Sequence, residues 1–172
     1  KLVSGATIIG WKFTTADDNV ENYDASGNLT SIVERNGRTT TLTHSTRSTP
    51  ASVASKAGLP IQVTEHFGRN LNRYYDFQAR VVSATDPSAN AYNFAYDEAS
   101  SIVVAGQFEG PNLTSVKFPD LHTRIYHYNE QSYTAGTNLP NALTGITDEN
   151  NVRFSTYQYD STGRALSSEL AG

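Results

Sequence analysis

The 172-residue chain contains no cysteine, so disulfide cross-links and thiol chemistry are excluded. That absence leaves the cellular compartment open. The chain also has no signal peptide and no run of 18 or more apolar residues, so the sequence predicts neither an export route nor a membrane span. It begins at Lys1 and not at a methionine, and we expect it to be a piece of a larger protein.

Basic patches and helical periodicity are missing as well. The net charge is −4, and the 13 lysines and arginines are spread singly, which argues against nucleic acid as a partner. The best helical candidate, residues 51–58, is short and bounded by Pro50 and Pro60. The chain has 10 tyrosines and 7 phenylalanines, and no stretch of useful length has a helical pattern. Together these features predict a mostly β protein.

Catalytic and metal-binding motifs are absent too. The four histidines, at positions 44, 66, 122 and 127, form no His-Glu-x-x-His motif, and without cysteine a zinc site would need three of them to converge. No Gly-x-Ser-x-Gly elbow, phosphate loop or dinucleotide fingerprint occurs. We expect no enzyme activity, no cofactor and no metal site.

A repeated tyrosine motif is what the chain does contain. In the stretch TYQYDSTGRALSS at 156–168, Tyr157 and Tyr159 would share one face of an extended strand. Asp160 can accept hydrogen bonds from the backbone of a turn, and Gly163 can take the positive φ that a short hairpin loop requires. The stretch therefore predicts a strand, a turn and a second strand.

The same order of residues recurs along the chain. Its key tyrosines lie at positions 23, 75, 96, 128 and 159, with steps of 52, 21, 32 and 31 residues. The shortest step fits a repeat of two strands and two turns, and residues 63–71 look like a degenerate copy inside the longest step. A second kind of turn, at 35–42, 85–94, 118–126 and 147–157, is expected to join one copy to the next.

The repeat gives a set of candidate structural residues, and the aspartates among them are expected to cap turns by accepting backbone N–H bonds. Two alternatives remain open for carboxylates: a hydrolase pair, and calcium held by residues 24–28 or 148–151. The candidates are Tyr23, Asp24, Gly27, Tyr75, Asp76, Tyr96, Asp97, Tyr126, Tyr128, Tyr157, Tyr159, Asp160 and Gly163.

Several copies lack the turn glycine. Ala79, Ala89, Ser100 and Asn151 stand in its place, and a residue with a side chain at positive φ should cost about 1 kcal/mol. We therefore expect these turns to have a different shape or pairing.

The Tyr-Asp-x-x-Gly motifs at 23–29 and 159–166, together with residues 81–97 and 142–160, resemble the YD-repeat or Rhs (rearrangement hotspot) proteins of bacteria. The resemblance runs from about Trp11 to Leu166. Only 44–58 and 106–112 fit no repeat, and we expect them to be loop insertions in a single array spanning 1–172.

The resemblance implies a function as well as a fold. Long arrays in this family coil into a hollow β-shell that encloses a C-terminal toxin used in competition between bacteria. The five or six repeats of this chain are too few to close a shell, and the family's C-terminal autoproteolytic signature and toxin domain are absent. We therefore expect a wall segment of a secreted or cell-surface shell, built as a twisted or coiled antiparallel sheet of tandem hairpins.

Two alternatives use the same residues. The last strand, around Leu166 and Ser168, has no Pro, Lys or bulge to protect its edge, so further copies of the chain could add to it and form a filament. Alternatively the repeat tyrosines bind glycans by stacking on sugar rings, although a ladder of tyrosines in the core explains them more simply. Trp11 is expected to cap the first repeat. The Asn-Leu-Thr sequons at Asn28 and Asn112 are expected to be coincidental.

Overall fold

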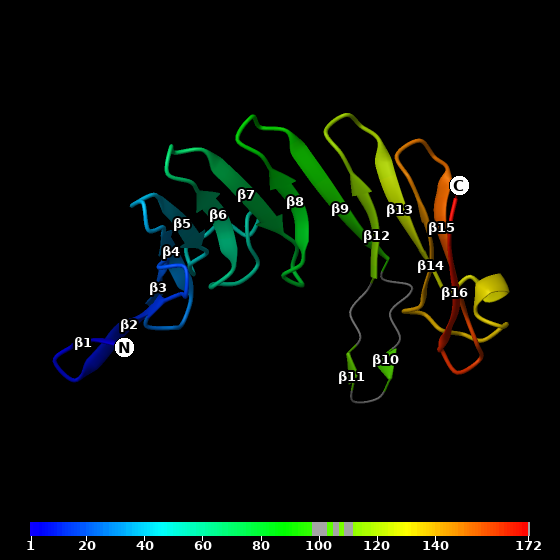
Figure 1. Ribbon diagram of the computed structural model, residues 1–172, viewed down its shortest axis with the longest axis horizontal. Coiled ribbons are helices and arrows are strands. Elements are labelled where there is room, and N and C mark those ends of the chain that lie inside the picture. The colour runs from blue at the N-terminus through cyan, green and yellow to red at the C-terminus, as the bar shows by residue number, and fades with distance from the viewer. Residues whose placement is uncertain (98–102, 105–106, 109–111, 172) are drawn as a thin grey trace. The chain divides into compact units, whose positions relative to one another are not determined.

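The computed structural model describes residues 1–97, 103–104, 107–108 and 112–171 (Figure 1). Strands and tight turns account for nearly all of them, and the expectation of an all-β hairpin array is confirmed. The chain divides into two compact units, 1–91 and 92–172. No helix of the described residues is long and apolar enough to cross a membrane.

In the first unit, eight strands are paired antiparallel in the order of the sequence, each with the next. Such pairing needs only hairpin connections, because consecutive antiparallel strands meet through a short turn. The strands are β1 Leu2–Ser4, β2 Thr7–Thr14, β3 Val20–Asp24, β4 Leu29–Val33, β5 Thr39–His44, β6 Pro60–Thr64, β7 Asn70–Tyr75 and β8 Val81–Thr85.

The second unit repeats this plan, with antiparallel pairs in the order β9, β12, β13, β14, β15 and β16. Two short strands, β10 and β11, pair with each other, and one 3₁₀ turn, η2, follows β13. The elements are β9 Ala91–Asp97, β10 Val103–Val104, β11 Gln107–Phe108, β12 Asn112–Lys117, β13 Thr123–Tyr128, η2 Gln131–Tyr133, β14 Leu143–Thr147, β15 Arg153–Tyr159 and β16 Ala165–Leu170. Ser100 and most of the predicted insertion at 106–112 lie outside the described residues.

The short hairpin turns share one geometry. At residues 24–28 the amide of Asp24 donates to the carbonyl of Asn28 at 2.9 Å, the amide of Gly27 donates to the carbonyl of Asp24 at 3.1 Å, and Gly27 has a φ of 87°. This is a tight turn followed by a left-handed residue and a bulge. The turns 34–38, 86–90, 118–122 and 148–152 have the same two hydrogen bonds. The expectation of two kinds of turn is therefore wrong.

What distinguishes the tyrosine motifs is the end of the sheet at which they lie. Because consecutive strands run in opposite directions, successive turns alternate between the two ends of each unit (Figure 1). The turn 24–28, the segment 45–59 and the turn 76–80 share one end in the first unit, and 129–142 and 160–164 share one end in the second. We call this end of each unit the tyrosine end.

The segment 45–59 is an enlarged turn of the same type. The amide of Ser45 donates to the carbonyl of Leu59 at 2.8 Å and that of Gly58 to the carbonyl of Ser45 at 2.9 Å, which are the bonds that Asp24, Gly27 and Asn28 make. His44 and Ser45 thus occupy the place of the tyrosine and aspartate. The degenerate copy assigned to 63–71 is misplaced, since the turn 65–69 lies at the opposite end of the strands.

With His44 in the series, the steps 23–44, 44–75, 75–96 and 128–159 correspond to a repeat of 21 or 22 residues. Positions 23 and 44 are 21 residues apart, as are 75 and 96. Between 44 and 75 the step is 31, of which ten are accounted for by a 15-residue segment, 45–59, in place of a five-residue turn. Between 128 and 159 the step is also 31, and the 14-residue segment 129–142 accounts for nine. The insertions therefore enter at the tyrosine end and leave the strands unchanged.

The turns without glycine keep the common shape. Ala79, Ala89 and Asn151 have φ values of 67°, 64° and 62°. The amide of Ala79 still donates to the carbonyl of Asp76, at 3.0 Å. The expectation that these turns change shape is wrong, and in all three an aspartate at the first position also accepts a hydrogen bond from the last amide of the turn. In the turn 76–80, an ion pair of 2.6 Å between Arg80 and Asp76 further stabilises the turn.

Replacing Ala79 with glycine is expected to raise the free energy of unfolding by about 1 kcal/mol, because glycine reaches this left-handed conformation without steric cost. Ala25→Gly in the turn 24–28 is the matched control, since Ala25 does not have a positive φ. Urea unfolding would measure both variants. Equal effects in the two would show that the backbone of Ala79 is not strained.

The two faces of the first sheet differ in polarity. Along β6 and β7, Gln62, Thr64, Asn70 and Asn72 point to one face, while Val63 and Leu71 point to the other with Leu42 across from them. The polar side chains bond to one another across strands, for example Gln62 to Asn72 at 2.9 Å and Thr64 to Asn70 at 2.6 Å. Of the described apolar residues only Ala54, Tyr75 and Val116 are fully buried.

Candidate functional site

The tyrosine-end turns are organised by their first side chain. Oδ1 of Asp24 accepts hydrogen bonds from the amides of Ser26 and Asn28, both at 2.9 Å, and Oδ2 accepts one from Nδ2 of Asn28. Oδ1 of Asp160 accepts from the amides of Thr162 and Arg164 in the same way. Hydrogen bonds from Asn28 hold the pKa of Asp24 below its ordinary value. In each of these turns the oxygens of the carboxylate accept hydrogen bonds from groups of the turn itself.

Asp76 has the same contacts in a more buried place. Burial opposes ionisation, but hydrogen bonds from Arg80 and the charge of its guanidinium outweigh that and leave the pKa of Asp76 lowered. Asp97 ends β9 opposite Asn112, and its side chain is outside what the structure describes. The predicted aspartates thus lie in separate turns, and no two of the three whose side chains are described share a turn.

Two of the repeat tyrosines, Tyr75 and Tyr159, bond to the strand next to them. The hydroxyl of Tyr75 donates to the carbonyl of Pro60 at 2.7 Å, and that of Tyr159 donates to the carbonyl of Leu143 at 2.9 Å. Pro60 and Leu143 are the first residues of β6 and β14, directly after the two described insertions. This use of the hydroxyl explains tyrosine in place of phenylalanine at these positions, and the sequence analysis missed it.

The tyrosines do not form a ladder of rings. They lie on alternate strands, so no repeat tyrosine pairs with another, and each has an aliphatic partner on the strand that follows: Leu29 for Tyr23, Val81 for Tyr75, Leu113 for Tyr96, Leu143 for Tyr128 and Ala165 for Tyr159. Only Tyr75 is fully buried, and the other four are half-buried. The expectation of a tyrosine ladder is wrong. Trp11, expected to lie apart as a cap, faces Tyr23 across β2 and β3.

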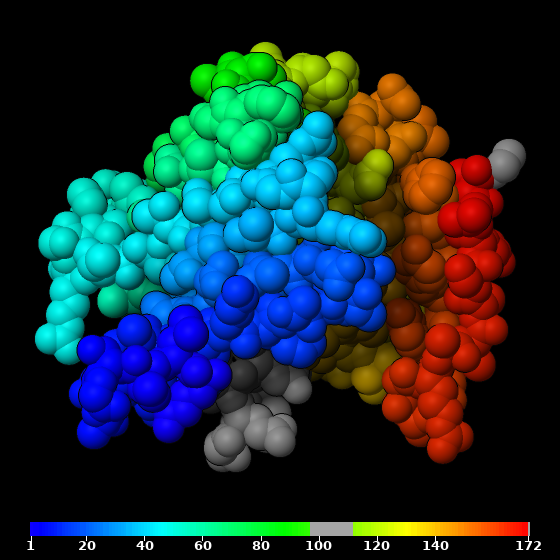
Figure 2. Space-filling view, turned by 60° about the vertical axis from the view of Figure 1, so that its left-hand side comes forward, coloured from blue at the N-terminus to red at the C-terminus, as the bar shows by residue number. Residues whose placement is uncertain are grey.

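Ser45 closes the insertion of the first unit. Its side chain is buried, and its Oγ donates to the carbonyl of Lys56 at 2.7 Å and accepts from the amide of Leu59 at 2.9 Å. Farther along, the carbonyl of Val53 accepts a hydrogen bond from the amide of Tyr75 at 2.9 Å. These contacts tie the ends and the middle of the insertion to the sheet, while its outer part stands out from the surface of the unit (Figure 2).

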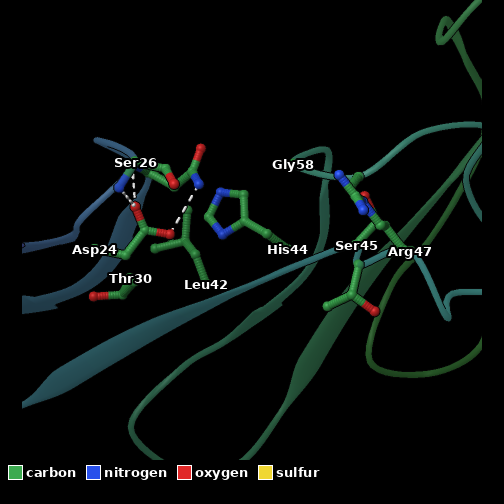
Figure 3. Close-up of a pocket in the computed structure, with 11 residues that line it drawn as sticks. Asp24, Ser26, Thr30, Leu42, His44, Ser45, Arg47 and Gly58 are labelled. Carbon is green, nitrogen blue, oxygen red and sulfur yellow. Dashed lines mark hydrogen bonds between the residues drawn. The ribbon is translucent and has the colours of Figure 1, made fainter. Parts of the chain in front are cut away.

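A polar pocket of about 680 Å³ lies between this insertion and the turn 24–28. Asp24, Ser26 and Asn28 line one side, Ser45, Thr46 and Arg47 the other, and the ring of His44 lies between the two groups (Figure 3). After the hydrogen bonds from Asn28 and Ser26, a smaller electrostatic contribution from His44 also lowers the pKa of Asp24. Asp24 and Ser45 are both bonded to backbone groups, so each serves the turn or insertion that it belongs to.

The insertion of the second unit, 129–142, is held by an ion pair. The guanidinium of Arg153 donates to both carboxylate oxygens of Glu130, at 3.1 and 2.8 Å, and also to the carbonyl of Thr144 at 2.9 Å. The hydroxyl of Thr144 donates to Glu130 at 2.7 Å, and the ring of Tyr133 lies 4.8 Å from the guanidinium. We call Glu130, Arg153, Thr144 and Tyr133 the clamp.

The clamp also depends on Gly145, because a Cβ there would overlap the guanidinium of Arg153. Glu130 and Arg153 are 23 residues apart and on different elements, so no local pattern indicates their contact. The Arg153 hydrogen bonds lower the pKa of Glu130 below its usual 4.5.

The remaining candidates are dispersed. Tyr126 and Tyr128 lie on β13 and Tyr157 on β15, and all three are half-buried. In the part of the chain that the structure describes, no three His, Asp or Glu side chains gather as a metal site. Both sequon asparagines are engaged, Asn28 with Asp24 and Asn112 with the carbonyl of Pro140 at 2.9 Å.

Comparison with known families agrees with the geometry at the tyrosine end. The family model described as RHS Repeat matches residues 23–53, which begin at the first tyrosine turn and extend into the first insertion. The chain carries an RHS repeat. No curated protein matches the chain. The match at residues 23–53 supports the prediction from the sequence motifs that the chain is a segment of an Rhs/YD-repeat protein.

The RHS repeat is a structural repeat and not a catalytic one. The hydrogen bonds at the tyrosine end fit that role, since the aspartates, Ser45 and the hydroxyls of Tyr75 and Tyr159 are all bonded within the fold. The match and these hydrogen bonds together support a structural role for the segment.

Proposed function

We propose that this segment is part of the wall of a secreted or cell-surface bacterial shell that encloses a toxin. The observation that supports this best is the pairing of strands strictly in sequence order, with insertions confined to the tyrosine end. Each further repeat of 21 residues would widen such a sheet by two strands without altering those already present.

The packing of the first unit is consistent with a wall. Its sheet has a polar face and an apolar face, and Leu71 on the apolar face is still 41% exposed. A domain that buried a core between two layers would cover this face. In a wall, one face meets the enclosed cargo and the other meets solvent, so a single layer serves both.

The experiment is protease protection in the larger protein that contains this segment. We expect the region after the repeats to resist protease, and Val63→Pro to abolish that resistance, because proline removes a backbone N–H from an inner strand. Arg47→Pro, at the exposed second position of the turn 46–49, where proline is favoured, is the matched control and should leave protection intact. Rapid digestion in the parent protein, or equal protection in both variants, would contradict the proposal.

A second candidate function is glycan binding, and one observation favours it. In the first unit, Tyr74 lines two hollows, and amide and hydroxyl residues lie beside it in each: Thr43, Gln62 and Asn72 in one, Asn70, Asn72 and Thr85 in the other. An aromatic ring flanked by amides suits a sugar, which has an apolar C–H face and polar edges. Tyr74 is not a repeat tyrosine, so this differs from the glycan hypothesis based on the motif.

A further inference from the structure

Tyr74 separates two hollows on one face of the first unit. The first, of about 360 Å³, is lined by Thr43, Gln62, Asn72 and Tyr74, with Val53, Ile61 and Arg73. The second, of about 540 Å³, includes Asn70, Asn72, Tyr74 and Thr85, with Arg69 and the turn residues beside them. Asn72 and Tyr74 are common to both hollows, so the two form one continuous surface across β5 to β8.

The amides of this surface are joined into a row. Gln62 donates to Asn72 at 2.9 Å, Asn72 donates to Thr85 at 3.3 Å, and Thr64 donates to Asn70 at 2.6 Å. These bonds fix the side chains in place and leave hydrogen-bonding capacity unused. Within the described residues, the hydroxyl of Tyr74 and the amide nitrogen of Asn70 have no hydrogen-bond partner. The row is therefore preorganised to bind a ligand with many oxygen acceptors.

The charges around the surface are balanced. Arg69 is paired with Glu65 at 2.7 Å, and the carboxylate of Asp86 accepts bonds from the amides of Ser88 and Asn90. Arg73 and Asp86 line opposite hollows and carry opposite charges. A strongly charged polymer would gain attraction at one hollow and meet repulsion at the other, so an uncharged ligand fits best.

We infer that this surface binds a neutral, linear oligosaccharide that lies across the strands, with one sugar ring stacked on Tyr74 and its neighbours in the two hollows. The inference rests on the second candidate function above. From Thr43 on β5 to Thr85 on β8 the surface crosses three strand spacings, about 14 Å in all. That length suits a short oligosaccharide and not a single sugar.

Isothermal titration calorimetry of the chain with cellohexaose and with hexagalacturonic acid tests the inference. We expect cellohexaose to bind and Tyr74→Ala to lower its association constant at least about tenfold. Asn22→Ala is the matched control, since Asn22 also bonds across strands on the polar face, to Ser31, but lines neither hollow. It should bind cellohexaose like the parent protein, and circular dichroism verifies that both variants are folded.

The results of the titrations distinguish a failure of the Tyr74 surface as the binding site from a failure of glycan binding itself. Cellohexaose binding that Tyr74→Ala leaves unchanged, or that Asn22→Ala weakens equally, would overturn this site while glycan binding stands. Tighter binding of hexagalacturonic acid would overturn the requirement for a neutral chain. If neither oligosaccharide binds, the site and the glycan-binding function fail together, and the proposal of a shell wall is unaffected.

Discussion

Replacing Arg153 with leucine is expected to lower the free energy of unfolding by about 2 to 3 kcal/mol, because Glu130 would keep its charge in a partly buried place without the guanidinium that balances it, and with only the Thr144 hydroxyl still bonded to it. Both side chains of the pair are about one-third exposed, at 30% and 32%, so the effect should fall below that of a fully buried pair. Urea unfolding measures the loss. Gly145→Ala should act in the same direction, since the new methyl group would displace the guanidinium of Arg153.

Arg124→Leu is the matched control for the clamp. Arg124 pairs with Glu149 at 2.8 Å, but its side chain is 43% exposed, and such a pair contributes less than about 1 kcal/mol.

The dependence of the free energy of unfolding on acid pH provides a second measurement of the clamp. Because the pKa of Glu130 is lowered in the folded protein, its contribution is present above the usual 4.5 and is lost as pH falls through the lower folded value. Arg153→Leu should reduce this acid sensitivity, and equal losses in the two leucine variants would contradict a special role for the clamp.

The parts of the fold that the sequence predicted are those set by local contacts. The Asp24 carboxylate bonds to amides two and four residues away, so residues 24–28 contain everything that the turn needs. The alternation around Tyr157 and Tyr159 likewise requires only an extended strand. For the same reason the glycine-free turn at Ala79 could be recognised by position, although its unchanged geometry depends on Asp76 and Arg80.

What the sequence did not predict depends on residues distant in the chain. His44 and Ser45 share no side chain with the Tyr-Asp motif, and their equivalence is visible only from the backbone bonds to Gly58 and Leu59. The clamp joins Glu130 to Arg153 across 23 residues. Tyr74 follows β-strand alternation onto the face opposite its neighbour Tyr75, and only the pairing of β7 with β6 and β8 shows which polar residues surround it.

Replacing Ser45 with alanine is expected to open the insertion 45–59 and to lower the free energy of unfolding by about 2 kcal/mol. The buried hydroxyl of Ser45 pairs with two groups, the carbonyl of Lys56 and the amide of Leu59, and alanine would remove both hydrogen bonds. Opening should expose the peptide bonds after Arg47 and Lys56, the two basic residues of the insertion, to trypsin. The rate of cleavage there, followed by mass spectrometry, is the measurement.

Two further variants identify the cause of any change. Ser48→Ala also removes a hydroxyl from the insertion, but that hydroxyl lies at the surface beside Thr46, so cleavage and stability should be unchanged. Ser45→Asp restores the residue type of the other tyrosine-end turns and can still accept from the amide of Leu59, yet it cannot donate to Lys56. We expect it to be cut at an intermediate rate. If Ser45→Ala is cut no faster than the parent protein, the insertion is held by its contact with Tyr75 and not by Ser45.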